Sequence, residues 1–148
     1  MSEGSLNFSA AELNLVVHAT EDERKLLKSI EDTLSVAADC FIRSTSEGHF
    51  KNEIVLLKAM IPAKQAEALA LRIISLLNRS DRAQLSHSLH EYSDEKGNLY
   101  LRLDKQRLCR GKVSLSETDS IRVRLKPVKR YKPSGIIENY RGLLSSTE

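Results

Sequence analysis

Tryptophan is absent from this 148-residue chain, and aromatic residues make up only 5% of it. Proteins that bind single-stranded nucleic acid without sequence preference stack bases on aromatic side chains, so this scarcity argues against a rich stacking platform. The two cysteines, Cys40 and Cys109, are too few and too far apart for a disulfide framework or a zinc knuckle. We therefore expect reduced thiols and a cytoplasmic protein.

Long apolar runs and catalytic motifs are also missing. No stretch approaches the length of a membrane-spanning helix, and the N-terminus lacks the basic-then-apolar pattern of a secretory signal. The sequence holds no glycine-rich phosphate loop, and no nucleophile motif surrounds either cysteine. We expect no membrane partner, no cofactor and no catalytic residue.

The composition that remains is typical of a soluble globular protein. Hydrophobic residues make up 41% of the chain and charged residues 29%, as in ordinary globular domains. A chain of this length buries roughly two-thirds of its unfolded surface. We predict a flexible N-terminus over residues 1–10 and a single domain over residues 11–128. Residues 129–148 are predicted to form a basic, then amphipathic, C-terminal tail.

Positive charge is concentrated in one segment. Twelve Lys and Arg and only three acidic residues lie between Lys96 and Lys132, a net charge of +9. The whole chain carries +3, so the remainder carries −6. Such asymmetry indicates a polyanionic partner, and nucleic acid is the commonest one. The alternative is a solvated sheet face whose cations pair with acidic helices elsewhere in the fold.

Two alternating stretches place these cations on a common surface. Leu99 to Leu103 alternates leucines with Tyr100 and Arg102, and Ile121 to Lys126 alternates apolar residues with cations. Side chains two apart on a strand share a face, and arginine engages phosphate through two hydrogen bonds, while Tyr100 can stack on a base or ribose. A basic loop joins the two strands. The expected nucleic-acid contacts are Tyr100, Arg102, Lys105, Arg107, Arg110, Lys112, Arg122, Arg124 and Lys126.

The rest of the chain predicts further strands and helices. Strands are expected over 12–17, 37–44 and 53–61, and helices over 21–34, 64–78 and 80–89. Thr20 and Glu23 fit a capping box at the first helix, and residues 45–48 a turn. The apolar run at 54–57 predicts a strand buried on both faces, or one that starts a helix-covered sheet. Residues 136–144 predict a short amphipathic helix that binds a partner, docks on its own domain or is disordered.

Carboxylates and imidazoles support two weaker hypotheses. His87 and His90 share a helical face, but no third ligand lies nearby, so we predict no metal site. Asp94, Glu95 and Asp104 could gather Mg²⁺ for phosphodiester cleavage. Acids are ordinary in a turn, however, and Asp104 is better placed to order Lys105 or Arg107. A non-enzymatic protein is therefore expected.

Three stretches, in the same order, resemble a known family. They are His18 to Asp22, Gly48 to Ile54, and Asp94 to Leu115, which contains GNLYLRLDKQ and CRG. They resemble an archaeal family of RNA-binding domains described as predicted exosome subunits, over roughly Glu12 to Pro127. The family pattern has glycine where this chain has Lys51 and proline where it has Glu53, so the loop geometry there is not carried over.

The resemblance implies a fold and a function. The fold would be similar to that of ribosomal protein L five, an α+β domain with helices packed on one face of an antiparallel sheet. The function would be RNA binding, linked to RNA processing with the exosome or to ribosome assembly. Scarce aromatics favour structured RNA, ribosomal RNA among the candidates, recognised by shape and backbone. The alternative is a protein-interaction adaptor of an RNA-processing complex that uses its acidic helical side or its tail.

Overall fold

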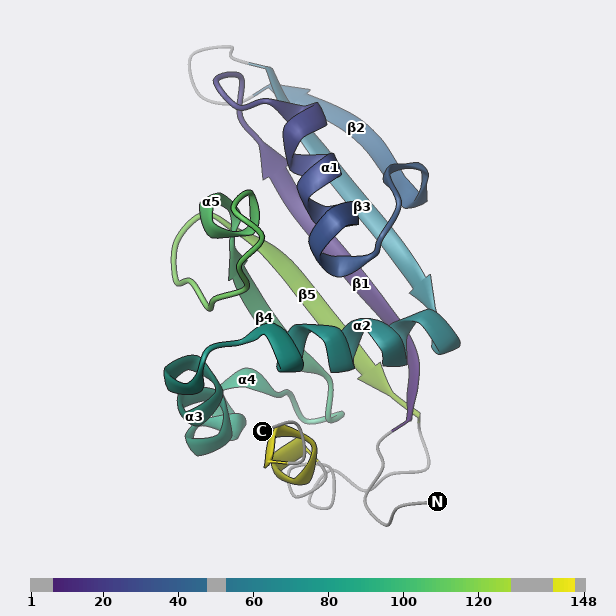
Figure 1. Cartoon of the computed structure of the whole chain (residues 1–148). Helices are drawn as coiled ribbons and strands as arrows, with labels where there is room; N and C mark the ends of the chain where they lie inside the picture. The colour runs from purple at the N-terminus through teal and green to yellow at the C-terminus, as the bar shows by residue number, and fades with distance from the viewer. Residues whose placement is uncertain (1–6, 48–52, 129–139, 146–148) are drawn as a thin grey trace.

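The computed structural model of the chain describes residues 7–47, 53–128 and 140–145 and shows an α+β fold (Figure 1). Its elements, in chain order, are β1 (Phe8–Val17), α1 (Glu23–Leu34), the 3₁₀ helix η1 (Ala38–Cys40), β2 (Phe41–Glu47), β3 (Glu53–Pro62), α2 (Ala63–Leu76), α3 (Arg79–His87), α4 (Leu89–Tyr92), β4 (Leu99–Asp104), α5 (Lys105–Leu108) and β5 (Ser120–Pro127). A last helical stretch, the C-terminal helix, covers 140–145. The predicted fold class is confirmed.

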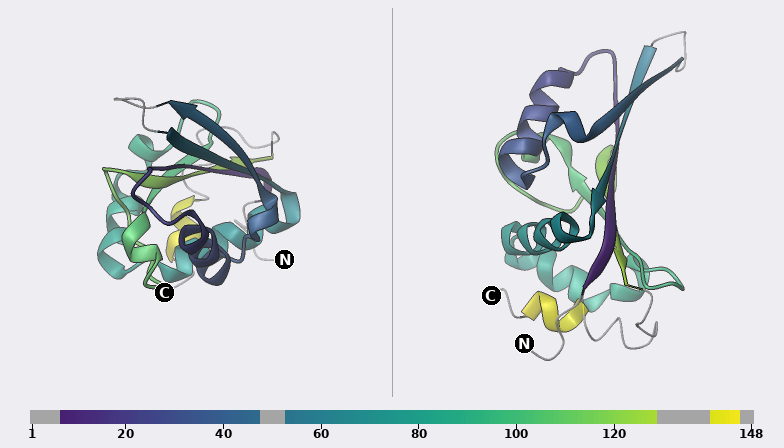
Figure 2. Two further views of the ribbon diagram at one scale, coloured as in Figure 1. Left: turned by 90° about the horizontal axis from the view of Figure 1, so that it is seen from above. Right: turned by 90° about the vertical axis from the view of Figure 1, so that its right-hand side faces the viewer.

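The strands form one five-stranded sheet in the order β2-β3-β1-β5-β4, and every neighbouring pair is antiparallel. Helices α1 and α2 cover the same side of this sheet (Figure 2). The side chains that face them are buried, among them Leu13 of β1, Val123 of β5 and Leu101 of β4. The alternate residues of each strand point away from the helices and form the outer face. On this face β4 and β5 carry their polar side chains.

Two strands differ from their predicted form. β2 begins at Phe41 because a turn of 3₁₀ helix precedes it, and it continues through Thr45 and Ser46, which the sequence predicted as a turn. These residues pair with β3 and are therefore strand. β3 is buried on one face only: Leu56 and Met60 point outward and are 37% and 49% exposed. The apolar run at 54–57 therefore does not mark a strand covered on both faces.

Helix starts were the least accurate part of the prediction. Asp22 caps α1, because its carboxylate accepts a hydrogen bond from the Lys25 amide at 3.1 Å, and the predicted capping box of Thr20 and Glu23 is wrong. Asn78, not Ser80, caps α3, with 2.7 Å between its side-chain oxygen and the Asp81 amide. In both places a polar side chain two positions from the predicted cap makes the bond instead.

The C-terminal helix packs on its own domain. Tyr140 and Leu144 are 1% and 3% exposed, and the Tyr140 ring stacks on Phe8 of β1 at a centroid distance of 6.3 Å. The Tyr140 hydroxyl donates to the carbonyl of Gly97 at 2.7 Å. The apolar stripe predicted over residues 136–144 is therefore used internally over its described part, 140–144. None of the described helices combines the length and apolar character needed to span a membrane.

Candidate nucleic-acid interface

The strand register brings cations from three strands into one row on the outer face. Arg102 of β4 lies directly opposite Arg122 of β5. Arg122 lies opposite Asn14 of β1, and Asn14 lies opposite Lys58 of β3. Neighbouring strands are about 4.8 Å apart, so the row spans roughly 15 Å. We call the outer surface formed by Lys58, Tyr100, Arg102, Arg122, Arg124 and Lys126 the basic sheet face.

The three cations of this row lack acidic partners among the described residues. Lys58, Arg102 and Arg122 are exposed. Within residues 7–47, 53–128 and 140–145, none of them forms an ion pair with a carboxylate. Like charges directly opposite each other on a sheet destabilise the fold. Arg102 and Arg122 thus carry a cost that no contact within the described part of the chain offsets.

The next row is more closely tied together. Arg124 and Lys126 lie 3.7 and 3.6 Å from the carboxylate of Glu12, so part of their charge is already balanced. The guanidinium of Arg124 sits 5.6 Å from the centroid of the Tyr100 ring, within the range of a cation–π contact. Its Nε is buried and has no hydrogen-bond partner among the described residues. Tyr100 is 42% exposed, which leaves area for a base or ribose.

Asp94 fixes the turn that leads into β4. Its carboxylate accepts hydrogen bonds from the amides of Lys96 and Asn98 and from the Asn98 side chain, each at 2.9 Å. The Tyr100 hydroxyl donates to it at the same distance. Burial by itself would raise the pKa of Asp94, but these hydrogen bonds together hold it below its ordinary value. Burial and the nearby Asp94 carboxylate raise the pKa of Tyr100, so its hydroxyl stays a donor.

The predicted basic loop begins with a short helix, α5, in place of irregular chain. Asp104 caps it through a 2.9 Å bond from the Arg107 amide. The helix packs against α1, so it belongs to the helical side of the molecule. Arg107, Arg110 and Lys112 are exposed there. They do not lie on the basic sheet face.

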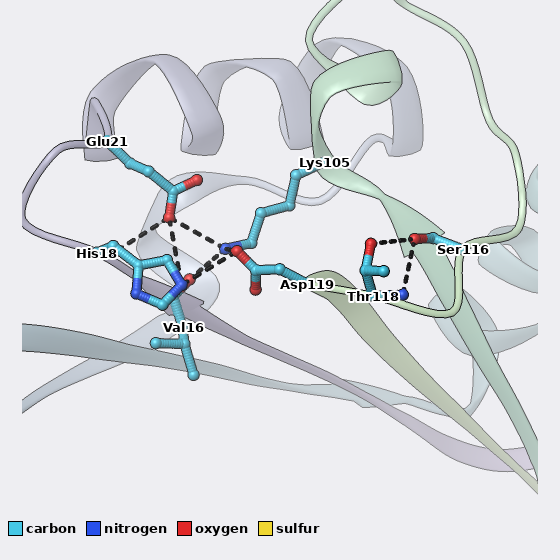
Figure 3. Close-up of polar contacts among 7 residues, drawn as sticks. All are labelled: Val16, His18, Glu21, Lys105, Ser116, Thr118 and Asp119. Carbon is cyan, nitrogen blue, oxygen red and sulfur yellow. Dashed lines mark hydrogen bonds and ion pairs between the residues drawn. The ribbon is translucent and has the colours of Figure 1, made fainter. Parts of the chain in front are cut away.

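Lys105 is the exception among the predicted contacts, because it is only 4% exposed. Figure 3 shows its ammonium between the carboxylates of Glu21 and Asp119, at 3.2 and 2.9 Å. The ammonium also donates to the carbonyl of Val16. Surrounded in this way, Lys105 cannot contact a phosphate, and the expectation that it does is corrected. It holds α5 and the loop before β5 against the start of α1.

The same cluster holds the potential metal ligands that come together in the described structure. His18 lies 3.1 Å from Asp119 and 4.0 Å from Glu21, and the ligand atoms of all three lie within 4.8 Å of one another. The Lys105 ammonium bonds to both carboxylates and supplies positive charge in this place. Asp94, Glu95 and Asp104, and likewise His87 and His90, form no such group in the parts of the chain that are described.

The structure therefore sorts the predicted residues into three sets. Tyr100, Arg102, Arg122, Arg124 and Lys126 share the basic sheet face, the three loop cations lie on the helical side, and Lys105 is buried. Sequence reasoning missed Lys58, because β3 was expected to be covered and only the register shows that Lys58 joins the row. A groove of about 470 Å³ runs over this part of the face, with Lys58 and Arg122 beside the apolar Ile42 and Leu56.

Comparison with known proteins identifies relatives of the chain. A family model described as RNA binding matches residues 10–127. The chain is 33% identical to RNA-binding protein PAB1135 of Pyrococcus abyssi over 129 residues, which cover 83% of this chain and 84% of that protein. It is 30% identical to the uncharacterized protein MJ0213 of Methanocaldococcus jannaschii, over 76% and 79% of the two chains.

A solved structure shares the fold. The crystal structure of protein SSO0741 from Sulfolobus solfataricus, a DUF54 protein, superposes with a TM-score of 0.77 at 26% identity and covers 95% of this chain and 100% of that one. The likeness to ribosomal protein L five stays a prediction.

Proposed function

This chain belongs to the RNA-binding family that its sequence matches, also known as DUF54, and on that premise we propose that it binds structured RNA through the basic sheet face. One observation carries the choice of surface. Arg102 and Arg122 lie opposite each other on neighbouring strands and are exposed to solvent. Neither has a carboxylate partner among the described residues. An RNA phosphate between them would neutralise the repulsion and accept hydrogen bonds from both guanidinium groups.

Structured RNA suits the geometry of this face. The cations follow a row across four strands and a second row beside it, while Tyr100 supplies the one aromatic ring among its named side chains. Such a surface engages phosphates and riboses along a folded RNA better than it stacks a series of unpaired bases. The loop cations Arg107, Arg110 and Lys112 lie on another side and are expected to act as accessory contacts.

The proposal is for binding without catalysis. The carboxylate of Asp94 is occupied by the turn that it organises, and Asp104 caps α5. Neither is left as an open ligand for Mg²⁺. The family resemblance further favours a setting in RNA processing, with exosome or ribosome-assembly proteins as partners, and this setting is part of the proposal.

The double variant Arg102→Thr/Arg122→Thr tests the proposed surface. Threonine suits a strand, so we expect the free energy of unfolding to stay the same or to rise by about 0.2–1 kcal/mol as the repulsion disappears. The affinity for a structured ribosomal RNA fragment should fall about tenfold or more, because two charge-assisted contacts are lost. Fluorescence anisotropy measures the affinity for that fragment and for a single-stranded oligonucleotide of equal length.

The matched control removes two cations from the other side of the molecule. Arg24→Ala/Lys28→Ala changes the net charge equally on the exposed surface of α1. It should weaken binding by no more than about twofold, the part due to long-range attraction. The proposed surface is wrong if the sheet variant binds as tightly as this control.

A protein-docking function is the second candidate, and one observation favours it. Ile42, Leu56 and Met60 expose apolar side chains on the β2–β3 half of the outer face. Exposed apolar residues gathered on one face are typical of protein–protein interaction sites. Recovery of a stoichiometric protein partner after nuclease treatment, lost in Ile42→Ser, would favour the adaptor function.

A further inference from the structure

A second concentration of arginine lies away from the basic sheet face. Helix α3 and the C-terminal helix lie side by side at one end of the molecule (Figure 1) and enclose a cleft of about 1000 Å³. The described residues that line it are Arg79, Arg82, Ala83, Ser86, His87, Arg141, Leu144 and Ser145. Three of these eight are arginines and none is acidic.

The two walls of this cleft follow from helical spacing. Arg79, Arg82 and Ser86 recur at intervals of three and four along α3, so they share one face of that helix. Leu144 and Ser145 follow Arg141 by three and four residues on the C-terminal helix, so these three residues also share a face and form the opposite wall. Guanidinium and hydroxyl groups from two elements thus converge on one open space.

The acid of α3 is directed elsewhere. Asp81 accepts hydrogen bonds from the amide of Leu115 and from the side chain of Asn78, at 2.9 and 3.2 Å. It therefore serves the contact between α3 and the loop before β5. Within the described residues, neither Arg79 nor Arg82 forms an ion pair with a carboxylate.

Arg82 adds an unsatisfied donor. One terminal nitrogen of its guanidinium donates to the Leu77 carbonyl at 3.3 Å, while its Nε is buried without a hydrogen-bond partner among the described residues. A buried donor without a partner is costly, whereas an anion nearby lowers the free energy of a guanidinium held in this way. The charge of this wall is therefore suited to a negatively charged ligand.

We propose that the cleft between α3 and the C-terminal helix is a second RNA-binding site, which holds phosphate groups of the RNA backbone. The inference rests on the proposed function, because it extends RNA binding to a second surface. A single phosphate ion would fill only a small part of a cleft of this size, whereas a nucleic acid strand passing along the α3 wall meets both Arg79 and Arg82. The C-terminal helix then completes a binding site in addition to covering the core.

The charge reversal Arg79→Glu separates binding from folding. Arg79 is exposed and is the first residue of α3, where an acidic side chain interacts favourably with the helix dipole. The variant should therefore melt at the wild-type temperature or higher. Its affinity for the structured ribosomal RNA fragment should fall about tenfold or more, with a salt dependence reduced by about one to two units of log-log slope.

Arg24→Glu is the matched control, because it makes the same charge reversal in the first turn of α1, outside the cleft. Long-range repulsion should weaken its RNA binding by no more than about threefold. The second site is excluded if Arg79→Glu and Arg24→Glu bind RNA equally well. In that case the proposed function still stands, provided that Arg102→Thr/Arg122→Thr loses affinity.

A second arm uses inorganic phosphate on the full wild-type chain. Nuclear magnetic resonance signals of the arginine side chains report whether the ion binds in the cleft. If the wild-type chain binds no RNA at all, both the proposed function and the inference are contradicted. Saturable binding of phosphate alone would then identify a site for free phosphate. We expect the wild-type chain to bind RNA, RNA to shift the signals of the cleft arginines, and Arg79→Glu to lose affinity.

Discussion

Lys105 and Arg122 lie on either side of the same loop, yet their surroundings give them opposite roles. Lys105 is enclosed by two carboxylates and a carbonyl, and Arg122 is exposed with Arg102 opposite. The sequence could not separate them, because both are cations of one basic segment. Glu21, a partner of Lys105, lies 84 residues away along the chain. Such a contact is fixed by the fold and leaves no local signal.

Asp94 is the residue whose protonation should affect stability. Its folded pKa lies below 3.8, so the charged form contributes stability that is fully present above that value and is lost as the pH falls below it. Asp94→Asn removes the negative acceptor for Asn98 and Tyr100 and should cost about 1–2 kcal/mol at pH 7. Urea unfolding at several pH values should show that the difference in free energy of unfolding between wild type and Asp94→Asn becomes smaller below pH 3.8.

The control for this series is Glu95→Gln, which removes an exposed acid from the same turn. Its stability relative to wild type should vary little across the same pH range. A gap for Asp94→Asn that stays constant down to pH 3, or that widens, would contradict the assigned role of the carboxylate.

At the scale of elements, periodicity predicted what lies within a strand or helix better than what lies at its ends. The alternation in Leu99 to Leu103 and in Ile121 to Lys126 placed the arginines on the correct faces of β4 and β5. The two helix caps are polar residues two positions away from the predicted ones. The helix α5 was missed because its four residues follow Asp104 directly, within a segment too short for a helical pattern.

Lys58 and the cleft between α3 and the C-terminal helix show a different limit of what can be predicted from the sequence. Lys58 joins Arg122 through Asn14, which is a matter of register between strands far apart in the chain. Arg141 faces α3 only because Tyr140 anchors the C-terminal helix on β1 and the turn before β4. Neither placement follows from local composition.

The Tyr140 hydroxyl is the polar anchor of the C-terminal helix. Tyr140→Phe keeps the stacking on Phe8 but removes the 2.7 Å bond and leaves the carbonyl of Gly97 without this partner. Burial, and secondarily Asp94, raises the pKa of Tyr140, so the hydroxyl donates across the whole working range. Chemical denaturation of Tyr140→Phe should show a free energy of unfolding that is lower than that of wild type by about 1–2 kcal/mol.

Tyr92→Phe serves as the comparison for that variant. Its hydroxyl accepts a 3.0 Å bond from Gln84 at an exposed position, so the loss should be below about 0.5 kcal/mol. Equal effects of the two substitutions would mean that the hydroxyl of Tyr140 does not anchor the helix.

At the scale of the whole molecule, the fold places the apolar core and the cationic surface on opposite faces of the sheet. Apolar side chains of all the central strands face α1 and α2 and form one core, which leaves the outer sheet face to carry Lys58, Arg102 and Arg122. The molecule thus presents a row of cations on one side and an arginine cleft at one end. A folded RNA long enough to reach both could bind with higher affinity than either surface provides alone.

The salt dependence of RNA binding tests the central claim most directly. Affinity for the structured ribosomal RNA fragment is measured from low to physiological salt for wild type and Arg102→Thr/Arg122→Thr. Each phosphate contact adds about −0.7 to −0.9 to the log-log slope, so the variant should bind more weakly with a slope shallower by about one to two units. Identical slopes and affinities would contradict the account, because the basic sheet face would then not contact the RNA.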